Sequence, residues 1–104
     1  MFIDPDNPLA AEILQEAGEV YFSACKKMVS SLEALRAFDC AIGPEAWDSE
    51  RVARRSQLLD AAAERVYFVL VQRDAMQLSG SETFLDDYGV PAEVISRMGQ
   101  RERK

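Results

Sequence analysis

Histidine is absent from the chain, and cysteine occurs only at Cys25 and Cys40. A structural zinc site needs four Cys or His ligands, so two thiols alone do not assemble a recognisable one. Serine and cysteine nucleophiles need a neighbouring base, and no Lys or carboxylate stands at a recognisable spacing to replace histidine. We therefore expect no metal, no cofactor, no catalytic residues and no enzymatic activity.

Glycine and long apolar runs are also scarce. The five glycines are isolated from one another, which excludes a glycine-rich loop that cradles phosphate. The longest apolar run, VYFVLV at 66–71, is far shorter than the roughly 20 residues that cross a bilayer. The opening MFIDPDNPLAAEI has acids where a secretory signal needs positive charge. We expect a cytoplasmic protein without a membrane segment.

Basic residues are missing from the first 25 positions, and the net charge of the chain is −6. That stretch carries Asp4, Asp6, Glu12, Glu16 and Glu19. An acidic chain repels phosphate backbones except where positive charge is concentrated, and the basic clusters here are short. Nucleic acid is therefore not the partner that we expect.

What the sequence does contain is helical periodicity. Asn7 and Pro8 form a good helix start, and only Gly18 interrupts the chain before Gly43 and Pro44. Apolar and small residues then follow one another at alternating spacings of four and three: Ala10, Leu14, Ala17, Tyr21, Ala24, Met28, Ser31, Leu35, Phe38 and Ile42. This seam predicts one long helix over 8–42.

A second long helix is predicted over 45–79, with a cap near Asp48 and a stop at Gly80. Its apolar stripe comprises Val52, Leu59, Ala62, Ala63, Val66, Val69, Leu70 and Met76. Tyr67, Phe68 and Val71 fall outside the stripe, so the middle of this helix is apolar nearly all round. Such a pattern is typical of a helix that is buried on several sides.

The two long helices should fold back on each other, which brings Glu33 and Asp39 near Arg51, Arg54 and Arg55. The fold class is thus all-α: a long antiparallel hairpin in a single domain, 1–104, with two short helices over 81–99 and a frayed tail at 100–104. The short helices cannot cover all of the apolar surface, so we expect a homodimer that forms a four-helix bundle. The candidate interface residues are Tyr21, Met28, Val66, Tyr67, Phe68, Leu70 and Val71.

Residues 84–98, FLDDYGVPAEVISRM, have the outline of a helix-turn-helix. The would-be DNA-facing side is acidic at Glu82, Asp86 and Asp87, and few basic groups follow. We therefore favour a helical corner that packs against the hairpin through Phe84, Leu85, Tyr88, Ile95 and Met98. A DNA-binding regulator that uses 84–98 is the alternative, and a steep loss of binding with added salt would distinguish it.

The stretch NPLAAEILQEAG at 7–18, followed by a long helix, resembles a group of short bacterial all-helical proteins with no assigned function. The resemblance extends over most of the chain and implies an all-helical fold and no particular activity. With the composition, it leads us to expect a non-enzymatic interaction or scaffold protein. Such a protein would act through a helical surface, on itself or on another protein partner.

Overall fold

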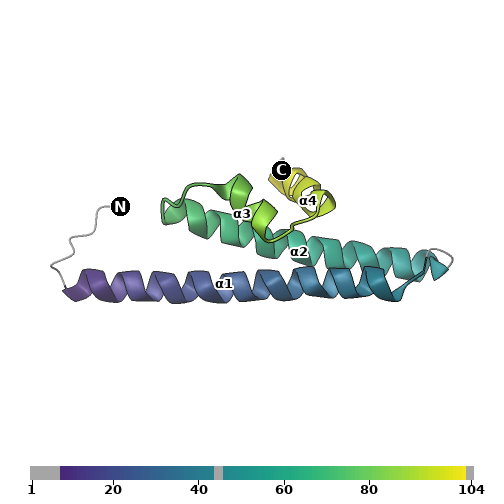
Figure 1. Ribbon diagram of the computed structural model, residues 1–104, viewed down its shortest axis with the longest axis horizontal. Coiled ribbons are helices and arrows are strands. Elements are labelled where there is room, and N and C mark those ends of the chain that lie inside the picture. The colour runs from purple at the N-terminus through teal and green to yellow at the C-terminus, as the bar shows by residue number, and fades with distance from the viewer. Residues whose placement is uncertain (1–7, 44–45, 103–104) are drawn as a thin grey trace.

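The computed structural model describes residues 8–43 and 46–102, with side chains over 12–43 and 46–99. This part of the chain holds four helices and no strand: α1 (Pro8–Ala41), α2 (Ser49–Ala75), α3 (Ser81–Asp87) and α4 (Ala92–Glu102). The helices α1 and α2 run antiparallel as a long hairpin, and α3 and α4 lie on one side of it (Figure 1). The predicted all-helical class and the packing of the two long helices are confirmed.

The second long helix is shorter at both ends than the predicted 45–79. It begins at Ser49 because the Asp48 carboxylate accepts a 2.9 Å hydrogen bond from the backbone N–H of Arg51, which caps the first turn. It ends at Ala75 because Gln77 adopts a left-handed backbone with φ of 58°. The N–H of Leu78 then bonds to the carbonyl of Arg73 at 2.9 Å, and that of Gln77 to Asp74 at 3.0 Å. This is a Schellman stop built on glutamine, upstream of the expected Gly80.

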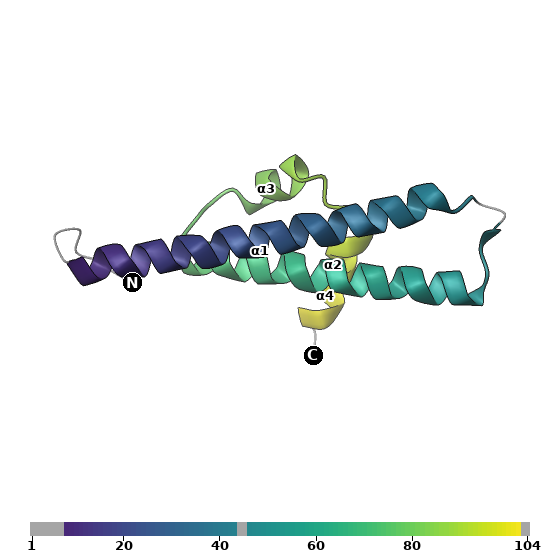
Figure 2. The ribbon, with the colours of Figure 1, turned by 90° about the horizontal axis from the view of Figure 1, so that it is seen from below.

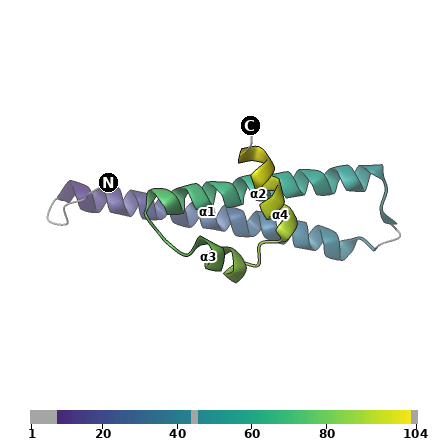
Figure 3. The same cartoon turned by 90° about the horizontal axis from the view of Figure 1, so that it is seen from above.

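One core joins three of the helices. It comprises Ala24, Met28, Leu32 and Leu35 of α1, Leu59, Ala62, Ala63, Val66 and Val69 of α2, and Val94 and Met98 of α4. Ala62 and Ala63 are adjacent in sequence and both fully buried. Because neighbouring helical residues point about 100° apart, α2 is covered on two sides, by α1 and by α4. Figure 3 shows α4 crossing α2 while α3 lies beside α1.

The two long helices are offset along their common axis. Near the C-terminal end of α2, Arg73 donates a 2.9 Å hydrogen bond to the Tyr21 hydroxyl. The part of α1 that precedes Tyr21 therefore extends past the last turns of α2, as Figures 1 and 2 show. After α2, the chain turns away toward α3 and does not follow α1 further.

Candidate interaction surface

The side of α2 that faces away from the hairpin core carries large apolar side chains. Tyr67, Phe68 and Val71 of α2 and Ile95 of α4 are each between 40% and 45% exposed. We call these four residues the outer α2 patch. Tyr67, Val71 and Ile95 share a groove of about 520 Å³ with the partly buried Leu70 and Leu85. A large exposed apolar cluster of this kind is typical of a protein interaction site.

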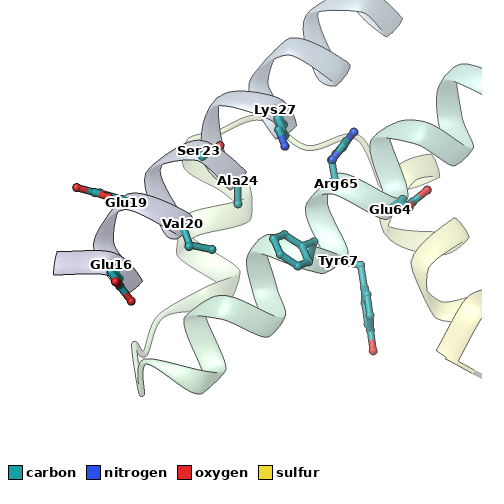
Figure 4. Close-up of a pocket in the computed structure, with 10 residues that line it drawn as sticks. Glu16, Glu19, Val20, Ser23, Ala24, Lys27, Glu64, Arg65 and Tyr67 are labelled. Atoms are coloured by element: carbon teal, nitrogen blue, oxygen red, sulfur yellow. The ribbon is translucent and has the colours of Figure 1, made fainter. Parts of the chain in front are cut away.

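A second groove, of about 820 Å³, continues from the patch to α1 (Figure 4). Val20 and Phe68 form part of its apolar lining. Figure 4 shows Glu16 and Glu19 toward one end of this groove, and Lys27 and Arg65 toward the other. Glu64 lies beside Arg65 at the second end, so the groove is apolar in the middle, acidic at one end and mixed in charge at the other.

The predicted interface residues separate into two groups. Tyr67, Phe68 and Val71 are exposed, whereas Met28 and Val66 have no exposed surface and lie in the core. Met28 and Val66 therefore cannot contact a partner in this arrangement. The apolar seam that contains them is buried in the contact between α1 and α2. Tyr21 and Leu70 pack against the core and are partly buried.

The predicted corner residues also divide. Met98 is buried, and Phe84 and Leu85 pack on the core, but Tyr88 and Ile95 are exposed. Among the α4 side chains at 92–99, Val94 is fully buried, and the sequence analysis did not single it out. Val94 and Ile95 are adjacent β-branched residues, so the apolar pattern alone does not indicate which of them faces α2.

The phenyl ring of Phe84 anchors α3 to the end of α2. The Arg73 guanidinium lies over this ring, 4.3 Å from its centroid, and donates a 2.7 Å hydrogen bond to the Ser79 carbonyl. The same guanidinium donates a hydrogen bond to the Tyr21 hydroxyl, which by itself lowers the pKa of Tyr21. Burial has the larger effect and raises the pKa of Tyr21 above its ordinary value. Arg73 thereby ties α1, α2 and the start of α3 together.

Residues 84–98 do not present a basic reading surface. Arg97 donates hydrogen bonds to Asp60 at 2.8 Å and to Ser56 at 3.0 Å, so its guanidinium is directed at α2. The extensive contact of α4 is with α2, and α3 has no comparable contact with α4. A helix-turn-helix needs its two helices packed on each other and its second helix open to the groove. This geometry lends no support to the DNA-binding alternative.

Arg55 holds three helices together. It donates to Asp39 of α1 at 2.8 and 3.1 Å, and to Glu93 of α4 at 2.7 and 3.1 Å. These hydrogen bonds lower the pKa of both carboxyl groups and raise the pKa of the guanidinium. The expected approach of Asp39 to the arginine cluster is confirmed at Arg55, whereas Arg51 pairs with Asp48 on its own helix end.

Within 8–43 and 46–102, no group of three or more Cys, Asp or Glu residues is arranged to hold a metal ion. Both thiols are free, with Cys25 partly buried and Cys40 exposed. None of the helices described here has the length and apolar character needed to span a membrane.

Comparison of the chain with protein-family models, curated proteins and solved structures finds no match. Its function is therefore inferred from the exposed side chains, charges and contacts of the molecule itself.

Proposed function

We propose that the chain is a non-enzymatic helical interaction protein that forms a homodimer through the outer α2 patch. Two hairpins would then bury α2 on its third side and complete a four-helix bundle. The observation that carries the proposal is the exposure of Tyr67, Phe68 and Val71 in the middle of a helix whose other two sides are covered. The free thiols fit a reducing compartment such as the cytoplasm.

The energetics favour pairing of two copies. Burial of one large apolar side chain contributes about 1.5–3 kcal/mol, and a two-fold interface uses each residue twice. A small domain has limited capacity to bury its own apolar surface, and Phe68 stays 45% exposed although α4 packs on α2. Association is the remaining way to cover the patch.

The test is the solution mass of the purified protein, measured by light scattering across a dilution series. We expect twice the 11.6 kDa monomer mass at high concentration, and a monomer for Phe68→Glu. The matched control is Phe22→Glu, because Phe22 is 63% exposed on α1 and lies outside the patch. This control should keep the wild-type mass.

Two outcomes contradict the proposal. One is a wild-type monomer at every concentration. The other is a Phe68→Glu variant that dimerises as strongly as the wild type, which would place any self-association on a different surface.

A further inference from the structure

The face of α1 that packs on α2 continues beyond the end of α2. Ala24, Met28, Leu32 and Leu35 form this face within the hairpin. Continued toward the N-terminus at helical spacing, it passes through Ile13, Leu14, Ala17 and Val20. We call residues 12–20 the N-terminal α1 segment. Its side chains occupy the same seam as the core. Val20 still shares a groove with Phe68 of α2, whereas Ile13 and Leu14 do not line that groove.

The exposure of this seam follows from where α2 stops. The Schellman turn at Gln77 ends α2 close to the level of Tyr21 and sends the chain toward α3. Ile13 and Leu14 are consequently 40% and 55% exposed, and Val20, at the edge of the groove with Phe68, is 47% exposed. A helical seam with two apolar residues per turn is the surface onto which a further helix packs.

One flank of this seam is acidic. Glu12, Glu16 and Glu19 are spaced by four and three residues, so they lie along one side of the helix, and all three are exposed. Figure 4 shows Glu16 and Glu19 on the same stretch of α1 as Val20. No Lys or Arg precedes Lys26 in the chain. The segment therefore presents an apolar seam beside a line of like negative charges.

We propose that the N-terminal α1 segment binds an amphipathic helix of a partner protein whose flanking residues are lysine or arginine. The partner would extend the line of α2 along α1, place apolar residues on Ile13, Leu14 and Val20, and pair its cations with the three glutamates. Charge excludes the same segment of a second copy, because two acidic flanks would meet. It also disfavours nucleic acids and anionic lipid surfaces.

The site adjoins the outer α2 patch, because Glu16, Glu19 and Val20 line one groove with Phe68. Its apolar contacts at Ile13 and Leu14 lie outside that groove, so its occupation does not require the proposed homodimer. Ile13 and Leu14 belong to α1 beyond the hairpin contact, while the patch lies on α2 and α4. Val71→Glu, which changes the patch outside the shared groove, should therefore retain binding of the basic helix.

The test uses the full chain and a synthetic amphipathic peptide of roughly 18 residues, about five helical turns. The peptide carries leucine at alternating spacings of three and four and lysine on both flanks. A second peptide has glutamate in place of every lysine. Binding is followed by fluorescence anisotropy of the labelled peptide at low salt. We expect the lysine peptide to bind at least about tenfold more tightly than the glutamate peptide.

Three variants locate the binding. The triple reversal Glu12→Lys, Glu16→Lys and Glu19→Lys retains good helix formers and should transfer the preference to the glutamate peptide. The double variant Ile13→Ser, Leu14→Ser should weaken binding of the lysine peptide by about tenfold or more. Phe22→Ser, the matched control on the same helix, should bind as the wild type does. Circular dichroism checks that all variants stay helical.

The proposal is overturned if charge reversal leaves the peptide preference unchanged, because the acidic flank would then not contact the peptide. It is also overturned if Phe22→Ser weakens binding as much as the double variant does. The same result at Phe68→Glu, with Ile13→Ser, Leu14→Ser unaffected, would assign the peptide to the outer α2 patch instead.

Discussion

Arg55 illustrates how much of this fold depends on the geometry of one side chain. Its guanidinium bonds in a forked arrangement to Asp39 and to Glu93, so a single planar group links α1, α2 and α4. A lysine ammonium could not make both bidentate pairs, because its donors radiate from one point. The Arg55 side chain is 23% exposed, which leaves these pairs less screened than ordinary surface ion pairs.

Replacement of Arg55 by alanine should lower the free energy of unfolding by about 1–2 kcal/mol, because two carboxylates lose their donor at once. Arg54→Ala is the matched control: Arg54 is exposed and bonds only to Gln57 of its own helix among the contacts seen. Its substitution should change stability by less than about 0.5 kcal/mol. Urea denaturation measures the free energy of unfolding of both variants. Equal losses in the two would show that the hydrogen bonds of Arg55 to Asp39 and Glu93 contribute no stability.

At the scale of elements, the ends of α2 and α3 use the same backbone motif with different residues. At the end of α3, Gly89 has φ of 63°, and the N–H of Val90 bonds to the Leu85 carbonyl at 3.0 Å. Arg36 of α1 donates to the carbonyls of Tyr88 and Gly89 at 3.0 and 3.1 Å. This turn sets where α4 begins, and thereby which of its residues meets α2.

Gly89→Ala should destabilise the protein by about 1–2 kcal/mol, because a left-handed backbone is costly for a residue with a Cβ. The added Cβ would also stand 3.1 Å from Arg36 Nη2. Gly18→Ala is the opposite case: Gly18 lies inside α1 and an added Cβ meets nothing within 4 Å.

The Gly18 variant should therefore gain about 0.5–1 kcal/mol from helix propensity. Thermal unfolding of the two variants beside the wild type checks the opposite signs. A stable Gly89→Ala protein would mean that the turn relaxes to another backbone conformation without cost.

The whole molecule is elongated, with extents of 61 × 26 × 22 Å and a radius of gyration of 17.0 Å. A compact domain of 100 residues has a radius of gyration of about 13 Å. An elongated shape exposes more surface for the same chain, and here that surface includes the outer α2 patch and the N-terminal α1 segment. Both proposed interactions follow from this shape.

Acid should destabilise the whole molecule through Asp39 and Glu93. Hydrogen bonds from Arg55 hold the pKa of both carboxyl groups below their ordinary values, so the unfolded chain binds protons more readily than the folded one. The stabilisation is present at neutral pH and is lost as pH falls from about 5 toward 3.

The double variant Asp39→Asn, Glu93→Gln should show a shallower loss of stability with falling pH, measured from urea midpoints. In an Arg55→Ala background the same double variant should add little, because the coupling has already been removed. An unchanged acid slope in the double variant would place the acid sensitivity on other carboxylates.

Several features followed from the sequence because they depend on local chemistry. The all-helical class and the antiparallel hairpin follow from the spacing of apolar residues and from the helix-breaking Gly-Pro pair in the sequence at 43–44. The predicted stripe of α2 is buried from Leu59 to Val69, at Leu59, Ala62, Ala63, Val66 and Val69, whereas its first member, Val52, is 57% exposed. Periodicity determines these because one face of each long helix must be apolar for the hairpin to form.

Other features depend on how the elements meet. The sequence of a helix that is apolar nearly all round does not show which of its sides neighbouring helices cover. The packing of α1 and α4 decides this: it buries Met28 and Val66 and leaves Phe68 exposed. Likewise, the position of α4 on α2 decides that Val94 is buried and Ile95 is not. The end of α2 decides which stretch of α1 stays uncovered. Those positions result from long-range packing and a left-handed turn at a glutamine, which no local pattern encodes.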